Sequence, residues 1–403
     1  MTRLVYSGGR QDGLFGLDRA WRRKVMAMRI VIAPDKFKGA VSARQAAEAI
    51  GRGVQRARAD AELVICPMAD GGEGTVAAMV EATGGRIVKQ NVCGPLPGML
   101  VDAEVGVSGD GQTAVIEMAS ASGLALLAPG ERNPLRTTTY GTGELIRTAS
   151  GLGVRRIILG IGGSATTDAG LGTLQALGAR IRMADGSVRS EGDRPVVGRD
   201  LAEVSGIDWR GSLPELLIAC DVTNPLYGPD GAAAIYGPQK GASAAEVVML
   251  DGWLRRLADI TGTVIVAQRP GSGAAGGLGF GLSAFVNGTR MAGGFELIAE
   301  ALGFEAKLTG AQWCITAEGR LDGSSLKGKT AMGVARTCKR LGVKCVIMAG
   351  SVEAEAEERV YAETGAVAMS IVDGPMVLEE AMRRTEELLQ RAGGRWGRSL
   401  EAT

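Results

Sequence analysis

The sequence predicts an α/β protein with two domains, one a doubly wound parallel sheet and the other an α/β domain with a mixed sheet. Three observations support this prediction. Strands and a helix alternate over residues 28–67, the same alternation returns over residues 311–392, and the stretch between them is less regular. Alternating strands and helices are typical of parallel sheets, because each helix brings the chain back to the starting edge.

The first unit begins with a short apolar run rich in β-branched residues, Met28–Pro34, which predicts a buried strand. Apolar residues at helical spacing follow over residues 42–58, with Ser42 as the expected N-cap. A second apolar run, Glu62–Pro67, predicts the next strand. This strand–helix–strand order indicates parallel pairing.

The middle of the chain, residues 70–293, is expected to form the second domain. Residues 85–118 alternate apolar and polar positions around a turn signal, SGDGQ, which predicts hairpins or a meander. RRIILGIGG, residues 155–163, predicts a strand running into a glycine loop, and LLIACD, residues 216–221, predicts a strand ending in an acid.

The C-terminal part repeats the rhythm of the first unit. Strands are predicted at residues 311–318, 343–350 and 366–372, with helices at 330–342 and 376–392. Both chain ends thus predict doubly wound structure, although the sequence by itself does not show that they pack together.

Composition narrows the function classes. Hydrophobic residues make up 45% and charged residues 22% of the 403 residues, as in globular proteins. The net charge of +1 argues against nucleic-acid binding, and no apolar run reaches the ~18 residues of a membrane span. Small-molecule partners are therefore expected, and a homo-oligomer is left open.

Histidine is absent, which excludes histidine triads and histidine metal sites. Acid–base chemistry must then fall to carboxylates, Lys, Tyr or Cys, and a metal is expected to be a hard cation held by oxygen. The six cysteines form no C-x-x-C pair and predict reduced thiols in a cytoplasmic protein. Residues 1–27 resemble no signal peptide and predict an unstructured extension or an upstream start codon.

Two nucleotide-binding patterns occur in contexts that do not support them. Residues 323–330, GSSLKGKT, match the phosphate-loop pattern, but the preceding strand is expected to end near Ala317 and the next strand ends without an Asp. Residues 271–276, GSGAAG, match the dinucleotide pattern but follow Pro270 and lack an acid at the expected spacing. Neither a P-loop NTPase nor a nicotinamide site is predicted.

Four other loops combine acids, lysines and glycines at predicted strand ends, where open α/β sheets bind ligands. Each loop taken alone is also explained as a structural turn, because Gly, Asp and Asn favour turns. Together, amides and lysines suit phosphate oxygens and clustered carboxylates suit Mg²⁺, as phosphoryl transfer requires. The loops are APDKFKG at 33–39, ADGGEGT at 69–75, GIGGSATTDAG at 160–170 and CDVTNPLYGPDGAAAIYGPQKG at 220–241.

With these loops the chain resembles bacterial glycerate kinases, of the type that phosphorylates glycerate with ATP, usually at the 2-hydroxyl. The resemblance covers about residues 28–393. It rests on these segments, in family order: APDKFKGAVSA, MADGGEGT, RTTTYGTGEL, GGSATTDAG, CDVTNPLYGP, YGPQKGA, GSGAAGGLG, EGRLDGSSLKGK and AGS.

The resemblance implies an ATP- and Mg²⁺-dependent kinase that converts D-glycerate to 2-phosphoglycerate. It also implies a flavodoxin-like domain from residues 28–69 and 294–403, an inserted domain from residues 70–293, and an active site in the cleft between them. The chain departs from the family at Thr167, Ala169 and Ala317. Because Ala169 stands where relatives have Gly, the loop must form without the freedom for positive φ.

Asp168 is the expected base for the hydroxyl proton, because it follows a glycine loop at a helix start and no histidine is present. Lys36 and Lys38 are catalytic candidates that would contact the glycerate carboxylate or the transferred phosphoryl group. The remaining candidates are Asp70, Glu73 and Asp221 for Mg²⁺, and Gly71, Gly72, Gly162, Gly163, Ser164, Lys240, Gly273, Gly276 and Lys329 for substrate or phosphate.

Several alternatives remain open at this stage. Some of the acids would fit a purely structural role as helix caps. Another small sugar-acid kinase, a non-catalytic metabolite-binding regulator and a hydroxy-acid dehydrogenase are the rival functions. Substrate competition, ADP production and nicotinamide absorbance, respectively, distinguish these rivals from a glycerate kinase.

Overall fold

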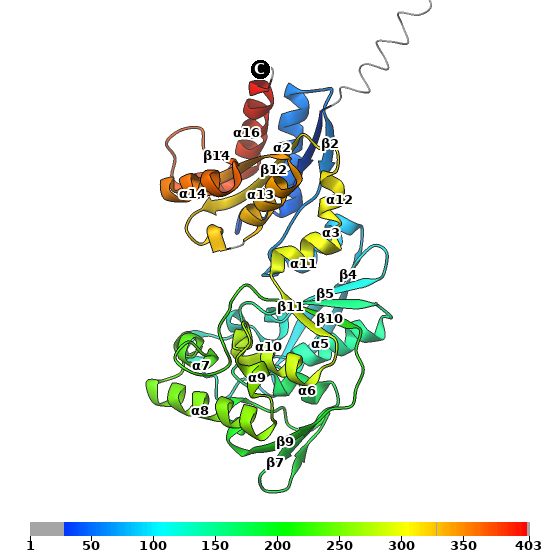
Figure 1. Cartoon of the computed structure of the whole chain (residues 1–403), viewed down its shortest axis with the longest axis vertical. Coiled ribbons are helices and arrows are strands. Elements are labelled where there is room, and N and C mark those ends of the chain that lie inside the picture. Colours follow the sequence, from blue (N-terminus) through cyan, green and yellow to red (C-terminus); the bar gives the residue numbers. More distant parts are fainter. Residues whose placement is uncertain (1–27, 328, 401–403) are drawn as a thin grey trace, which may run out of the picture.

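The computed structural model describes residues 28–327 and 329–400, and the expectation for residues 1–27 lies outside this range. Two main sheets lie at different heights along the long axis of the molecule (Figure 1). One is a five-stranded parallel sheet and the other a six-stranded mixed sheet, so the predicted α/β class is confirmed. Among the described residues no helix is both long and apolar enough to cross a membrane.

The parallel sheet is built from both ends of the chain. Its strand order is β14-β13-β12-β1-β2, and every neighbouring pair is parallel. Counted along the chain this is the order 2-1-3-4-5, the flavodoxin-like arrangement. Its strands are β1 (Arg29–Ile32), β2 (Glu62–Ile65), β12 (Trp313–Leu321), β13 (Lys344–Val352) and β14 (Val367–Ser370).

Helices cover both faces of the parallel sheet. Ile30 and Ile32 of β1 pack into an apolar cluster with α2 and α16, whereas Val31 points to the opposite cluster with α11, α12 and α13. This alternation follows from the two-residue period of a strand. The helices around this sheet are α2 (Ala43–Ala57), α11 (Gly294–Ala301), α12 (Phe304–Leu308), α13 (Thr330–Leu341), α14 (Ala354–Thr364), α15 (Leu378–Arg383) and α16 (Thr385–Ser399).

The mixed sheet has the order β11-β10-β6-β5-β4-β3. Its β3–β4 and β4–β5 pairs are antiparallel, which confirms the predicted meander, and the remaining pairs are parallel. Its strands are β3 (Arg86–Cys93), β4 (Leu100–Val107), β5 (Thr113–Glu117), β6 (Arg156–Gly160), β10 (Glu215–Ala219) and β11 (Thr289–Ala292).

Helices and a small antiparallel sheet of order β8-β7-β9 complete this part of the molecule. The small strands are β7 (Arg180–Met183), β8 (Val188–Arg189) and β9 (Val204–Asp208). The helices are α3 (Thr75–Thr83), α4 (Ala119–Ser122), α5 (Tyr140–Gly151), α6 (Leu171–Ala176), α7 (Ala232–Tyr236), α8 (Ala244–Ile260), α9 (Val264–Ala267) and α10 (Ala274–Phe285).

The structure corrects two of the predicted elements. β12 extends to Leu321, beyond the expected end near Ala317, because residues 318–321 continue parallel pairing with β13. The predicted closing helix is two helices, α15 and α16, which meet at Arg384. No Gly or Pro stands at that break, and the helical spacing of apolar residues continues across it, so the sequence pattern predicts a single helix.

The chain passes between the two main sheets twice, after β2 and after β11, and the two crossings touch. A Cβ on Gly71 would lie 3.2 Å from the Cα of Gly294, and a Cβ on Gly294 would overlap the carbonyl oxygen of Asp70. Apolar side chains of α3 and α11 share one buried cluster beside these crossings. The domain boundaries expected at residues 70 and 293 stay a prediction.

Helices α2 and α16 pack backbone to backbone through glycine. A Cβ on Gly53 would overlap the carbonyl oxygen of Gln390 and would lie 2.8 Å from the amide nitrogen of Gly394. The rings of Trp313 and Trp396 stack edge to face at 5.3 Å between centroids beside this contact. The helix pair therefore has no room for a larger residue at position 53.

We predict that Gly53→Ala lowers the free energy of unfolding by about 2–4 kcal/mol, because the added methyl group forces α2 and α16 apart. Urea unfolding followed by circular dichroism measures the change. Gly252→Ala is the matched control, since Gly252 is exposed in α8 and a Cβ there meets nothing within 4 Å. The control should gain roughly 1 kcal/mol from helix propensity. Equal stability of both variants would contradict the close packing.

Candidate active site

Two cavities lie on either side of the segment that links β2 to α3, residues 70–74, which we call the junction loop. The parallel-sheet cavity has a volume of about 650 Å³ and the mixed-sheet cavity about 460 Å³. Asp70 and Gly72 line both cavities. Both volumes fall in the range of small-molecule sites.

The parallel-sheet cavity opens at the carboxyl ends of β1, β12 and β13. Chain connections run from β1 toward β2 on one side and from β12 toward β13 and β14 on the other. The gap between β1 and β12 is therefore the topological switch point, where open α/β sheets bind ligands. Lys36, Lys38, Glu73 and Lys329 of the predicted site line this cavity.

Three lysines reach the parallel-sheet cavity from two loops. The ammonium of Lys36 passes over the junction loop, since a Cβ on Gly74 would lie 3.3 Å from its Nζ. Lys38 pairs with Glu73 at 3.3 Å, and both side chains are exposed. Lys329 immediately precedes α13 and donates a hydrogen bond to Ser324 Oγ at 2.8 Å. These contacts are weak enough to be exchanged for an anionic ligand.

Two carboxyls, the half-buried Asp35 and the buried Glu318, line the same cavity and were not singled out in the predicted site. Burial, with the charge of Asp70, raises the pKa of Asp35 to about 6, although Thr330 donates to it at 2.6 Å. Burial likewise raises the pKa of Glu318 to about 7. Glu318 is only 9% exposed, and its Oε1 finds no hydrogen-bond partner among the described residues.

The mixed-sheet cavity opens where the adjacent parallel strands β6 and β10 end. Gly162, Gly163 and Ser164 follow β6, Asp221 follows β10, and all line the cavity together with Gly71. Asp221 accepts a hydrogen bond from the amide of Gly294 at 2.8 Å. Burial raises the pKa of Asp221, and the charges of Asp70 and Glu296 add to that effect.

Lys240 is the cation of the mixed-sheet cavity. It is 1% exposed, and its ammonium donates to the carbonyl oxygen of Thr166 at 2.6 Å. Burial lowers its pKa to about 7, and the nearby charge of Asp168 partly opposes that shift. An anion bound in the cavity would favour the charged form of Lys240.

Asp168 lies outside both cavities. Its carboxylate is fully buried and accepts hydrogen bonds from Thr139 N at 2.7 Å, Thr139 Oγ1 at 2.8 Å, Gly170 N at 3.1 Å and Gly172 N at 3.3 Å. Burial raises the pKa of Asp168, and the four hydrogen bonds, which lower that pKa, offset the effect only in part. The carboxylate of Asp168 is therefore hydrogen-bonded to the start of α6 and to the segment before α5, and it does not line either cavity.

Gly273 and Gly276 also lie behind the cavity wall, which is formed by Ala274 and Ala275. A Cβ on Gly273 would overlap the carbonyl oxygen of Pro225, and one on Gly276 would overlap that of Thr166. These glycines let backbone pack on backbone, a role that sequence patterns do not separate from ligand contact.

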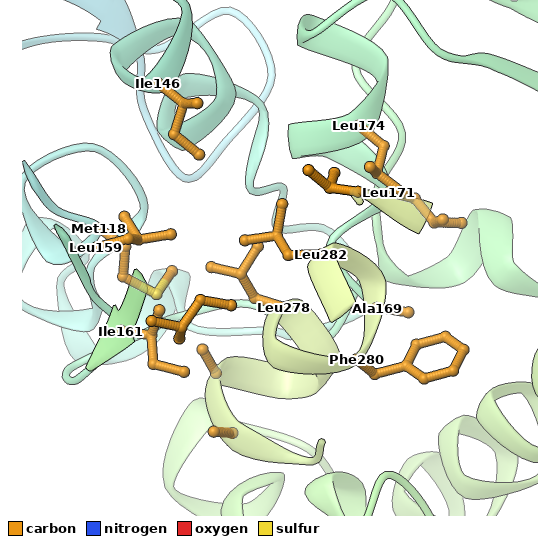
Figure 2. Close-up of a cluster of buried hydrophobic side chains, with 14 of the residues drawn as sticks. Met118, Ile146, Leu159, Ile161, Ala169, Leu171, Leu174, Leu278, Phe280 and Leu282 are labelled. Atoms are coloured by element: carbon orange, nitrogen blue, oxygen red, sulfur yellow. The ribbon is translucent and has the colours of Figure 1, made fainter. Parts of the chain in front are cut away.

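Ala169 adopts the left-handed conformation at φ 56°, as Ala275 does at φ 53°. Its methyl group belongs to the buried cluster around α6 and α10 that Figure 2 shows, with Leu171 and Leu278 nearby. The loop that lacks a family glycine thus forms, at the cost of local strain in a fully packed setting.

The three residues predicted for Mg²⁺ do not form a ready-made cage. Asp70 faces Asp221 on one side and Asp35 on the other closely enough to raise the pKa of each, whereas Glu73 pairs with Lys38. Among the described residues no group of three or more acids or cysteines is placed to hold a metal. Mg²⁺ commonly takes one or two carboxylates and completes its shell with phosphates, which Asp70 and its neighbours fit.

The GSSLKGKT segment borders the parallel-sheet cavity through Ser324 and Lys329. It follows β12 after a single residue, closer to a strand end than the sequence predicts. β13 ends at Val352 without the Asp of a phosphate-loop fold. The motif thus borders the cavity on a flavodoxin-like sheet, and its Gly328 lies outside the described residues.

Comparisons with known proteins agree on one family. The model of the glycerate kinase family matches residues 30–401. The glycerate kinase of Bacillus subtilis (strain 168) is 45% identical over 367 residues, covering 90% of this chain and 95% of that protein. The glycerate 2-kinase of Escherichia coli (strain K12) is 46% identical over 327 residues, covering 80% and 85%.

A solved structure is similar over nearly the whole chain. It is a crystal structure from Salmonella typhimurium LT2, provisionally named glycerate kinase 2, with 44% sequence identity and a TM-score of 0.83. The match covers 93% of this chain and 99% of that one. Fold and sequence similarity therefore extend together over both sheets.

We predict that Glu318→Gln stabilises the protein at pH 8 by about 2 kcal/mol. The pKa of Glu318 is about 7 in the folded protein, above its ordinary value of 4.5, so ionisation opposes folding once the pH exceeds 4.5. The gain should shrink as the pH falls and vanish below about pH 3.5, where Glu318 is largely protonated in both the folded and the unfolded protein. Urea midpoints at pH 5 and pH 8 measure this, with the exposed Glu355→Gln as a control that changes little at either pH. A gain independent of pH would contradict the raised pKa.

Proposed function

Because this chain belongs to the glycerate kinase family, we propose that it transfers the γ-phosphoryl group of ATP to D-glycerate and forms 2-phosphoglycerate. It is an enzyme, a phosphotransferase with an alcohol group as acceptor. The observation that most supports the proposed mechanism is the pair of cavities that share Asp70 and Gly72. Two substrates in adjoining cavities would meet at the junction loop.

Phosphoryl transfer depends mainly on positioning and on neutralising charge. Lys36, Lys38 and Lys329 would offset the charge of phosphate oxygens, since all three border the parallel-sheet cavity. Lys240 would offset an anion in the mixed-sheet cavity. Gly71, Gly72, Gly162 and Gly163 would let backbone amides approach the ligands closely.

Asp70 and Asp221 would hold Mg²⁺, because they face each other across the edge shared by the cavities. The ion supplies positive charge that lowers the repulsion between the transferred phosphoryl group and the acceptor. Glu73 would act from farther out, through its ion pair with Lys38.

We assign Asp168 a positioning role in place of the base role that the sequence suggests. Its four accepted hydrogen bonds hold the amides of Thr139, Gly170 and Gly172, and so fix the start of α6 next to the 160–170 loop. Asp70 and Asp221, the carboxylates that line the mixed-sheet cavity, would then both hold Mg²⁺ and orient the acceptor hydroxyl, without a separate base. The free thiols fit a cytoplasmic enzyme.

Incubation of the purified protein with ATP, Mg²⁺ and D-glycerate tests the proposal directly. We expect ADP to form only when glycerate is present, and phosphorus NMR should identify 2-phosphoglycerate. Product phosphorylated at the 3-hydroxyl would correct the regiochemistry, and ADP formed only with a different sugar acid would identify another kinase. Binding without ADP production would leave a regulator.

Asp70→Asn should lower kcat about a hundredfold or more, because the neutral amide removes charge at the edge where the substrates meet. Thermal unfolding should change little, since Asn can still accept the hydrogen bond from Gly72 N, which is 3.0 Å long in the wild type. Asp259→Asn, at an exposed position of α8, serves as the control with unchanged turnover. Turnover near the wild-type rate in Asp70→Asn would remove Asp70 from the mechanism.

A further inference from the structure

We infer that the parallel-sheet cavity binds the nucleotide, with the adenine base on an apolar wall formed by α15 and α16, and that the mixed-sheet cavity binds the three-carbon acid. This division rests on the proposed function and goes beyond it, because a kinase requires both sites but does not fix which cavity takes which substrate. An apolar helix wall, the number of cationic side chains and a buried carboxylate oxygen without a donor among the described residues distinguish the parallel-sheet cavity from the mixed-sheet cavity.

Part of the apolar wall is α15, a helix that contributes no buried residue to the core. None of the six residues of α15 is buried, and Leu378 is 75% exposed while it lines the cavity. Met382 leans on the loop after β1, since a Cβ on Gly39 would lie 3.0 Å from its terminal methyl. The apolar residues on this side are Ile371, Val372, Leu378, Ala381, Met382 and Leu388.

Such a wall suits a flat, apolar ring system. Ligand pockets combine a mainly apolar lining with a few placed polar groups, and burial of a base would cover surface that water now meets. The three-carbon acid has no comparable apolar part. Contact with this wall would therefore stabilise bound adenine and would contribute little to the binding of glycerate.

The two cavities also differ in the number of cationic side chains that line them, although carboxylates line both. The parallel-sheet cavity is bordered by the lysines at 36, 38 and 329 and by Arg320, which itself pairs with Glu353 and Asp322. Among the described residues that line the mixed-sheet cavity, the cationic side chain is that of Lys240. A triphosphate requires several cations, whereas a single carboxylate requires one.

Glu318 fits a ribose in the parallel-sheet cavity. Its Oε1 is a buried acceptor that the described residues leave without a donor, and an unpaired buried acceptor is costly. A ribose hydroxyl can donate a hydrogen bond to this oxygen, whereas a fully ionised phosphate has no proton to donate. The polar groups of the other cavity, Ser164, Tyr236 and Gln239, match the hydroxyls of a small acid.

Ala381→Phe tests the base subsite, because a phenyl ring at this half-buried position projects into the space assigned to adenine. We expect the Kd for ATP, measured by calorimetry without glycerate, to rise roughly tenfold or more. The Kd for tripolyphosphate, which has no base, should stay within about twofold, as should the KM for glycerate. Val377→Phe is the matched control, since Val377 adjoins α15, is exposed and does not line the cavity.

Lys240→Met tests whether the mixed-sheet cavity binds the three-carbon acid. The KM for glycerate should rise roughly tenfold or more while the Kd for ATP stays within about twofold of the wild type. If Ala381→Phe left ATP binding unchanged, or raised the KM for glycerate and not the Kd for ATP, the assignment of the two substrates to the two cavities would be wrong. The proposed function would still stand, because the wild type would still turn over. Absence of both ATP binding and turnover in the wild type would instead overturn the proposed function itself.

Discussion

The close approach of backbone at the junction loop is the constraint on which the site depends. Gly71 touches Gly294 and Ala219, and a Cβ on Gly160 would overlap the carbonyl oxygen of Gly71. The two chain crossings and strands β6 and β10 of the mixed sheet therefore meet with no side chain larger than a methyl group between them. This contact holds Asp70 where the two cavities share an edge, and from there its charge raises the pKa of both Asp35 and Asp221.

Much of the fold follows from local patterns in the sequence. The helix predicted after Ser42 begins where the sequence places it, because Ser42 and Gln45 form a reciprocal capping box. Most predicted site residues also border a cavity, since the carboxyl ends of parallel strands meet at one edge of a sheet. A loop at a strand end, such as residues 160–164, is therefore placed correctly before any tertiary contact is known.

The remaining parts of the site depend on packing that no local pattern encodes. Asp168 and Ser164 stand in the same glycine-rich loop, yet one is sealed by four donors and the other faces a cavity. Glu318 stands at the end of the strand predicted at residues 311–318, and its burial comes from β12 continuing beside β13. Residue type and spacing are the same for a ligand contact and for a structural contact, and only the neighbours decide between them.

The two chain crossings between the sheets lie against each other and not at opposite edges of the molecule. Any swing of one sheet relative to the other would pivot there, with the smallest displacement at the junction loop and the largest at the outer rims. Each cavity is lined almost wholly from one side of this pivot, so its own walls would keep their shape during such a swing. The ends of two ligands that meet at the junction loop would therefore keep their alignment, while the outer rims would part to admit or release them.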